Sequence, residues 1–121
     1  MANLYMNECH MKYNIDLAED FSPFPFGRYT PLDGEYTGEV FREKVLKDKL
    51  IKIVSGDELI VNLNGIDIGI GSSFLTESFG GAVKKGYIDK KLFLESLRII
   101  CDDGLYDTEI RDYIKEAQVE S

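Results

Sequence analysis

The chain has 121 residues, of which 44% are hydrophobic and 30% are charged, values typical of one soluble globular domain. Its 22 acidic residues against 14 basic ones give a net charge of −8, so we expect neither nucleic acid nor an anionic membrane among its partners. No apolar run is long enough to span a bilayer, and no signal peptide is evident, so a cytoplasmic protein is expected. Cys9 and Cys101 lack metal-ligand spacing, and we expect both to be reduced.

The first predicted elements are a strand and a long loop. Apolar and polar residues alternate over positions 11–18, which predicts a half-buried strand. Residues 21–38 hold all three prolines and are predicted as a loop, in which residues 28–30 are a candidate second strand. The aromatic residues of this segment are Phe21, Phe24, Phe26, Tyr29 and Tyr36. We interpret the loop as a cover for the edge of the core, with a partner-facing surface as the alternative.

Helices and strands alternate after this loop. Residues 37–50 are predicted to form a helix with Thr37 as its N-cap. The nearly continuous apolar run 59–63 predicts a central strand covered on both faces. A helix with one apolar stripe follows at about residues 72–85, and Gly86 is expected at its C′ position.

The C-terminal part completes the pattern with a strand at residues 97–101 and an amphipathic helix at residues 105–117. Strands that alternate with helices predict an α/β fold whose sheet has parallel members and right-handed crossovers. We expect a single domain over residues 1–121, with flexible ends at residues 1–10 and 118–121.

The segment IGIGSSFLTESFGG at residues 68–81 joins the central strand to the next helix and is the main candidate for chemistry. Gly69 and Gly71 begin a dinucleotide-binding pattern, but Phe74 stands at the position of its third glycine and the lysine of a phosphate loop is absent. The Gly-x-Ser-x-Gly motif of serine hydrolases is missing, and the single histidine, His10, is expected at the surface near the chain end. We therefore predict no catalytic residue, no cofactor and no metal.

Ser72 and Ser73 lie where the helix is predicted to begin, and one of them is expected as its N-cap. A phosphate added there would meet the helix N-terminus and bring nearly two negative charges, enough to switch a protein interface. Gly80 and Gly81, further along the helix, are interpreted as a site of close packing on the sheet. The alternative for these glycines is a flat surface that a partner approaches closely.

This serine turn and the strand before it resemble the core signature of STAS domains, the fold of bacterial anti-sigma factor antagonists. Residues 61–66 (VNLNGI) are similar to the strand end, and residues 70–73 (IGSS) are similar to the serine turn. A closer resemblance, over about residues 12–117, is to a STAS-like family described as a domain of unknown function. Its matching motifs are FGRY at 26–29, DGEYTGEVFR at 33–42, GSSFL at 71–75 and FGG at 79–81.

The resemblance implies a STAS-like fold: a mixed sheet of about four strands with three or four helices packed mainly on one face. It implies a non-catalytic regulatory domain that binds a protein partner, either a histidine-kinase-like ATPase or an anti-sigma factor, and a homodimer is compatible with it. Ser72 matches the serine that a partner kinase phosphorylates in the antagonists, and Ser73 is the neighbouring candidate. Gly71 stands where the antagonists have an acidic residue, and Phe74 where they have a glycine.

Further site residues follow from the matched motifs. The expected partner surface around the serines consists of Gly71, Phe74, Glu77 and Ser78. The polar residues of the matched loop and helix, expected to pair and hold the loop, are Arg28, Asp33 and Arg42. Two alternatives stay open: a small-ligand-binding or enzymatic domain that uses the serine turn, and an acidic surface mimic that blocks a basic protein.

Overall fold

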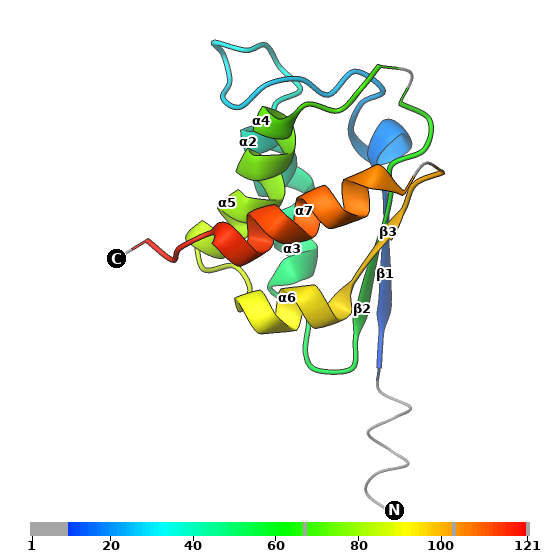
Figure 1. The fold of residues 1–121 in the computed structure, drawn as a ribbon, viewed down its shortest axis with the longest axis vertical. Coiled ribbons are helices and arrows are strands. Elements are labelled where there is room, and N and C mark those ends of the chain that lie inside the picture. The colour runs from blue at the N-terminus through cyan, green and yellow to red at the C-terminus, as the bar shows by residue number, and fades with distance from the viewer. Residues whose placement is uncertain (1–9, 67, 103, 121) are drawn as a thin grey trace, which may run out of the picture.

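The computed structural model describes residues 10–66, 68–102 and 104–120 (Figure 1). Residues 1–9, which include Cys9, and Ser121 lie outside this part of the chain. Most of the expected flexible N-terminal segment therefore lies outside the described residues. Within the expected flexible C-terminal end, the backbone N–H of Glu120 donates to the carbonyl oxygen of Lys84 at 2.9 Å.

The described chain contains one three-stranded sheet. Its strands are β1 (Lys12–Asp16), β2 (Glu58–Asn62) and β3 (Leu97–Ile100), in the order β1-β2-β3, and both pairings are parallel. The strands predicted at 11–18, 59–63 and 97–101 are confirmed. The strands β1 and β3 are shorter than predicted, β2 is shifted by one residue, and the central position of β2 is confirmed as well.

The expected fourth strand at residues 28–30 does not form, and the sheet is parallel rather than mixed. The backbone N–H groups of Arg28 and Tyr29 both donate to the carboxylate of Asp33, at 2.9 and 3.1 Å. The backbone N–H of Thr30 donates to Oε1 of Glu39 at 3.1 Å. Side chains therefore satisfy the donors that a neighbouring strand would otherwise have satisfied.

Five helical segments accompany the strands in the described residues. They are η1 (Leu17–Phe21), a continuous helix of α2 (Gly38–Phe41), η2 (Arg42–Leu46) and α3 (Lys47–Leu50), a second continuous helix of α4 (Ser72–Leu75), η3 (Thr76–Gly80) and α5 (Gly81–Lys84), then α6 (Lys90–Ser96) and α7 (Leu105–Glu116). The three helices predicted at 37–50, about 72–85 and 105–117 are confirmed. The sequence pattern indicates neither η1 nor α6, because segments of five and seven residues are too short to establish a helical period.

Two helix ends follow the residue chemistry expected of them. Thr37 caps α2, since its Oγ1 accepts a hydrogen bond from the backbone N–H of Val40 at 3.4 Å. Gly86 adopts φ +77, and its N–H donates to the carbonyl of Val83 at 3.0 Å, which closes the helix that ends with α5.

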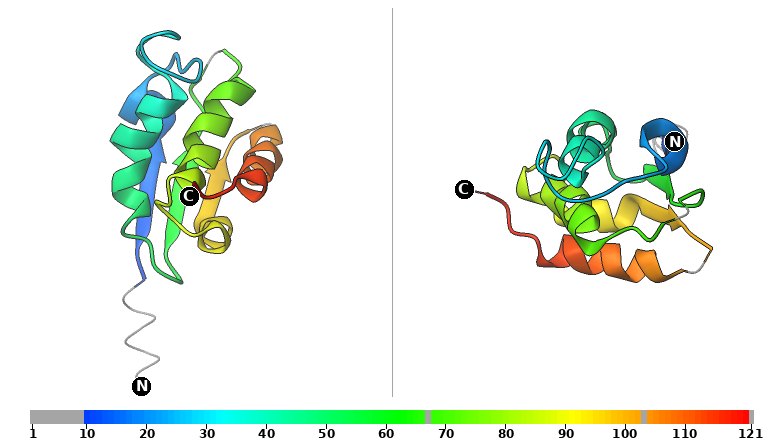
Figure 2. Two further views of the ribbon diagram at one scale, coloured as in Figure 1. Left: turned by 90° about the vertical axis from the view of Figure 1, so that its left-hand side faces the viewer. Right: turned by 90° about the horizontal axis from the view of Figure 1, so that it is seen from above.

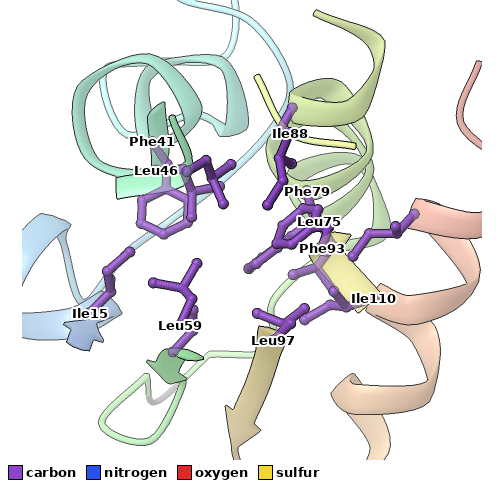
Figure 3. Close-up of a cluster of buried hydrophobic side chains, with 14 of the residues drawn as sticks. Ile15, Phe41, Leu46, Leu59, Leu75, Phe79, Ile88, Phe93, Leu97 and Ile110 are labelled. Atoms are coloured by element: carbon purple, nitrogen blue, oxygen red, sulfur yellow. The ribbon is translucent and has the colours of Figure 1, made fainter. Parts of the chain in front are cut away.

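The longer helices pack on one face of the sheet, and the other face is open (Figures 1 and 2). On the covered face, Leu59 and Val61 of β2 are fully buried against apolar side chains of the helices (Figure 3). Ile60 and Asn62 point to the open face and are only half-buried. The packing of helices mainly on one face is thus confirmed, whereas the prediction that β2 is covered on both faces is wrong. Because Ile60 is apolar although it points to the open face, β2 has the continuous apolar run that is typical of a strand buried on both faces.

Charged side chains line the open face near the start of the strands. Glu58 of β2 lies between Lys12 of β1, at 3.8 Å, and Arg98 of β3, at 3.6 Å. These exposed pairs keep this end of the open face hydrated.

Candidate functional site

The serine turn leads from β2 into the helix α4–η3–α5. The helix begins at Ser72, as expected, but its N-cap is Gly71, which has φ −75 and ψ 155 and makes no side-chain cap bond. The prediction that Ser72 or Ser73 caps the helix is therefore wrong, since both are helical residues. Glycine is among the residues accepted at an N-cap, and the two serine hydroxyls are directed to neighbouring elements instead.

Ser72 and Ser73 contact different elements. Ser73 is half-buried, and its Oγ accepts a hydrogen bond from Nη2 of Arg28 at 3.3 Å. Ser72 is exposed, and its hydroxyl lies against that of Tyr113 in α7, which donates to Glu109 at 2.6 Å. The bond to Glu109, together with burial, raises the pKa of Tyr113, and the Ser72 hydroxyl acts in the opposite direction. One serine thus faces a cation and the other faces a tyrosine–carboxylate pair.

Ion pairs connect Arg28 to the buried Arg42 through Glu77. Arg42 is 3% exposed, and its Nη1 donates to Oε2 of Glu77 at 2.6 Å and to the Glu77 carbonyl at 2.9 Å. Its Nε donates to Glu43 at 2.8 Å, while Nη1 of Arg28 lies 3.8 Å from Oε1 of Glu77. Burial alone would lower the pKa of Arg42, but the bonds to Glu43 and Glu77 outweigh burial and raise it. The buried guanidinium therefore stays charged and links the two long helices.

Asp33 organises the loop that carries Arg28. Its carboxylate accepts the backbone N–H groups of Tyr29 and Arg28, and these bonds lower the pKa of Asp33. Gly27, at φ +81, lies so close to Asp33 that a Cβ would overlap the Asp33 side chain. Arg28 and Asp33 thus hold the loop, whereas Arg42 contacts the helix residues Glu77 and Glu43 and makes no bond to Asp33 in the described chain.

The expected partner surface is only partly exposed. Phe74 and Ser78 are fully buried, so the prediction is wrong for these two residues. Phe74 stacks on Phe41 of α2 with ring centroids 5.7 Å apart, and the Ser78 hydroxyl donates to the Phe74 carbonyl at 2.8 Å. Gly71 is exposed, and Glu77 shows 12% of its side chain between the two arginines. The apolar stripe predicted from the sequence is too narrow, because α2 covers this flank of the helix as well.

Large apolar side chains protrude from residues 23–36, which we name the aromatic loop. Their exposed fractions are 62% for Phe24, 66% for Phe26, 46% for Tyr29, 89% for Leu32 and 45% for Tyr36. Phe21, just before this loop, packs instead against Phe41 with ring centroids 5.2 Å apart. Tyr36 packs edge-to-face on Phe21 with ring centroids 5.7 Å apart, so the interpretation as a cover for the core edge fits Phe21 and, in part, Tyr36. The rest of the aromatic loop presents an exposed apolar surface.

A hollow of about 480 Å³ lies between the aromatic loop and the start of α4. In Figure 1 the aromatic loop is the cyan segment near α4. Phe26 and Tyr29 line the loop side of the hollow, Ser72 and Ser73 line its helix side, and Arg28 belongs to its wall. Phe26 and Tyr29 of the aromatic loop therefore share one hollow with the two serines, and this hollow is the candidate functional site.

Gly80 and Gly81 allow close packing, but against helical residues rather than the sheet. A Cβ at Gly81 would lie 2.6 Å from Nη1 of Arg42, and a Cβ at Gly80 would lie 3.4 Å from the carbonyl oxygen of Tyr113. The interpretation of these glycines as a site of close packing on the sheet is therefore wrong: the close contact is that of Gly81 with Arg42, and the Gly80 contact has an ordinary van der Waals length.

Other kinds of site were also sought in the described ranges. His10 lies against Gly56 at the amino ends of the strands, whereas the serine turn follows the carboxyl end of β2, so these residues form no Ser–His pair. No group of three or more His, Cys, Asp or Glu side chains suited to a metal ion occurs among the residues described. None of the helices in that part of the chain combines the length and apolar character needed to cross a membrane.

Comparison with known proteins places the chain in a family. A family model described as a STAS-like domain of unknown function (DUF4325) matches residues 37–100, from the N-cap of α2 to the end of β3. No curated protein and no solved structure matches the chain. The matched segment covers more than half of the chain and includes the serine turn, the buried Arg42–Glu77 pair and two of the three strands. The chain therefore belongs to the STAS-like family of domains.

Proposed function

We propose that the chain is a cytoplasmic regulatory domain that binds a protein partner through the aromatic loop and the serine turn, without catalysing a reaction itself. The observation that carries this proposal is the exposure of five large apolar side chains within residues 23–36, two of which, Phe26 and Tyr29, line one hollow with Ser72 and Ser73. Contiguous exposed apolar surface marks interaction sites, and aromatic side chains dominate the energetics of protein interfaces.

The aromatic loop is held in shape before any partner binds. The N–H of Phe26 donates to the carbonyl of Tyr36, and the N–H of Gly38 donates to the carbonyl of Gly27, both at 2.9 Å. The hydroxyls of Thr30 and Thr37 lie 2.9 Å apart across the loop. A preorganised loop loses less conformational entropy on binding than a mobile one, which favours its use as a docking surface.

The serines give this surface a means of control, and a histidine-kinase-like ATPase is the partner we propose. Serine Oγ attacks the γ-phosphorus of a nucleoside triphosphate, the bond from that phosphorus to the bridging oxygen breaks, and the nucleoside diphosphate leaves. The hydroxyl proton passes to a base of the ATPase. The product carries about 1.5–2 negative charges at the rim of the aromatic loop, and an apolar interface formed over these charges would be weakened. An anti-sigma factor is the corresponding partner that the phosphate would release.

The test measures binding of the chain to the histidine-kinase-like ATPase encoded nearest to its gene, and to the nearest anti-sigma factor, by isothermal titration calorimetry. Phe26→Ser and Leu32→Ser should each weaken binding by about 30-fold, the effect of losing an interface hot spot of roughly 2 kcal/mol. Ile51→Ser is the matched control, because Ile51 is 59% exposed but lies at the far end of the helix that starts with α2. If the loop variants bind as tightly as the control, the aromatic loop is not the interface. Binding that only high salt abolishes would indicate acidic surface mimicry.

The hollow between the aromatic loop and α4 favours a second candidate function. Its volume of about 480 Å³ lies in the range of small-molecule sites, and its walls combine aromatic rings with two hydroxyls and a guanidinium. Under this alternative the domain binds a small anionic or polar ligand at the serine turn. Native mass spectrometry of the purified protein would detect a retained ligand, and Arg28→Gln should then release it.

A further inference from the structure

Both serines line the hollow that Arg28 also lines, but their hydroxyls contact different side chains. Both hydroxyls lie at the start of the same helix, so the helix itself does not distinguish them. Neighbouring helical residues point about 100° apart, and the side chains that they face therefore differ. Ser73 accepts a hydrogen bond from Arg28, whereas Ser72 faces Tyr113, whose proton is already donated to Glu109.

We propose that Ser73, rather than Ser72, is the serine on which this domain retains a phosphate, and that Arg28 is the group that binds the phosphate. This rests on the proposed function, because it names the serine of that switch and the residue that reads it. The transfer is the one described above, with Oγ of Ser73 as the nucleophile. Since Arg28 belongs to the loop, the phosphate would tie the aromatic loop directly to the helix.

Arg28 can leave Glu77 for the phosphate without leaving a buried carboxylate unpaired. The Arg28–Glu77 pair is long, at 3.8 Å, whereas Arg42 holds the same carboxylate at 2.6 Å. A phosphate offers more charge than a carboxylate and three acceptor oxygens that fit the planar guanidinium. The side chain of Arg28 is 38% exposed and lines the hollow beside Ser73, so the added group has space.

A phosphate on Ser72 meets the reverse arrangement. The Tyr113 hydroxyl beside it donates its proton to Glu109 at 2.6 Å and so has no proton for the phosphate. The Glu109 carboxylate of that pair carries a negative charge, which repels a phosphate on Ser72. Phosphorylation of Ser72 would therefore strain the contact between α4 and α7, and phosphorylation of Ser73 would strengthen the contact between α4 and the aromatic loop.

The experiment installs phosphoserine during translation at position 73 or at position 72 of the full chain, so that neither a kinase nor a partner is required. Titration by ³¹P NMR measures the second pKa of each phosphate, which is about 6 for an ordinary phosphoserine. The charged groups around position 73 are Arg28, Glu77 and Asp33, which lines the same hollow and accepts the backbone N–H groups of Arg28 and Tyr29. Because Arg28 is the group bonded to Ser73 and its charge favours the dianion, the phosphate pKa there should fall by about 1 unit. Facing Glu109, the phosphate at position 72 should show a raised pKa.

Matched variants separate these causes. Arg28→Gln should return the phosphate pKa at position 73 to the ordinary value, and Glu109→Gln should do the same at position 72. Arg98→Gln, on the open face of the sheet, should change neither. The proposal is overturned if Arg28→Gln leaves the pKa at position 73 unchanged, if the pKa at 73 is not below that at 72, or if phosphorylation at 73 lowers the melting temperature. Because no partner takes part, this result stands or fails independently of the calorimetric test of docking.

Discussion

Replacing Arg42 with methionine tests whether a buried ion pair joins the two long helices beneath the site. The change removes the guanidinium and keeps a flexible stem of similar shape. The guanidinium makes bonds of 2.6 and 2.9 Å to Glu77 and of 2.8 Å to Glu43. In the variant, Arg28, at 3.8 Å, is the one cation that the described residues leave beside Glu77, and the Glu77 carbonyl loses the Arg42 donor.

The expected loss follows from burial. Removing one member of a buried ion pair costs about 3–5 kcal/mol, because the remaining charge stays desolvated without its partner. Glu77 exposes 12% of its side chain and retains Arg28, so we expect a value near the lower limit, about 3 kcal/mol. For a domain of this length, such a loss lowers Tm by roughly 10 °C.

Urea denaturation followed by far-UV circular dichroism measures the free energy of unfolding. Arg98→Met is the matched control: the Arg98 side chain is 52% exposed, and its pair with Glu58 spans 3.6 Å, so its loss should cost less than about 1 kcal/mol. The double variant Arg42→Met/Glu77→Met should lose about 1–2 kcal/mol less than the sum of the two single variants. A loss below about 1 kcal/mol for Arg42→Met, or additive losses in the double variant, would refute the assigned role of the pair.

Gly38→Ala should destabilise the domain by about 1–3 kcal/mol although alanine favours helices, because its Cβ would lie 2.6 Å from the carbonyl oxygen of Phe74; a higher Tm would contradict this packing. The pKa of Asp33 is lowered from its ordinary 3.8, so its contribution to stability is present above that value and is lost as the pH falls through the lower folded-state pKa. In urea titrations, the free energy of unfolding should therefore fall less steeply below about pH 4 for Asp33→Asn than for the unmodified protein. The same pH dependence in both proteins would count against the Asp33 bonds. Gly86→Ala should cost about 1 kcal/mol in the same assay because its φ is +77, whereas Gly69→Ala, at a negative φ and with ordinary contacts, should cost clearly less; equal losses would argue against a backbone cause.

Residue patterns predicted the parts of the fold that depend on local sequence. The alternation around Ile15, the apolar run of β2 and the stripe of α7 correctly identify two strands and a helix, because each pattern spans several residues with one period. Thr37 and Gly86 identify helix ends, because capping depends on the chemistry of single residues. The short helix α6 has no period to recognise, and its cap, Asp89, is the only local signal for it.

Patterns failed where a residue has two uses. Serine and glycine both serve as N-caps, and the structure uses Gly71, which leaves the hydroxyls of Ser72 and Ser73 for contacts with other elements. Phe74 and Ser78 lie outside the predicted stripe, yet α2 packs over them. Which flank of a helix is covered depends on where a second helix lies, and this position cannot be predicted from the sequence of one helix alone.

The sequence by itself determined the three strands and the three long helices in their order, the turn that carries the serines, and membership of the STAS-like family, because these depend on local periodicity and on motifs within short segments. Only the tertiary structure decided that the aromatic loop is exposed and that Ser73 faces Arg28 while Ser72 faces Tyr113. These facts join residues that are 40 or more positions apart, and their contacts arise from the packing of helices on one face of the sheet. The electrostatic difference between the two adjacent serines therefore comes from the fold, and it cannot be predicted from the two residues alone.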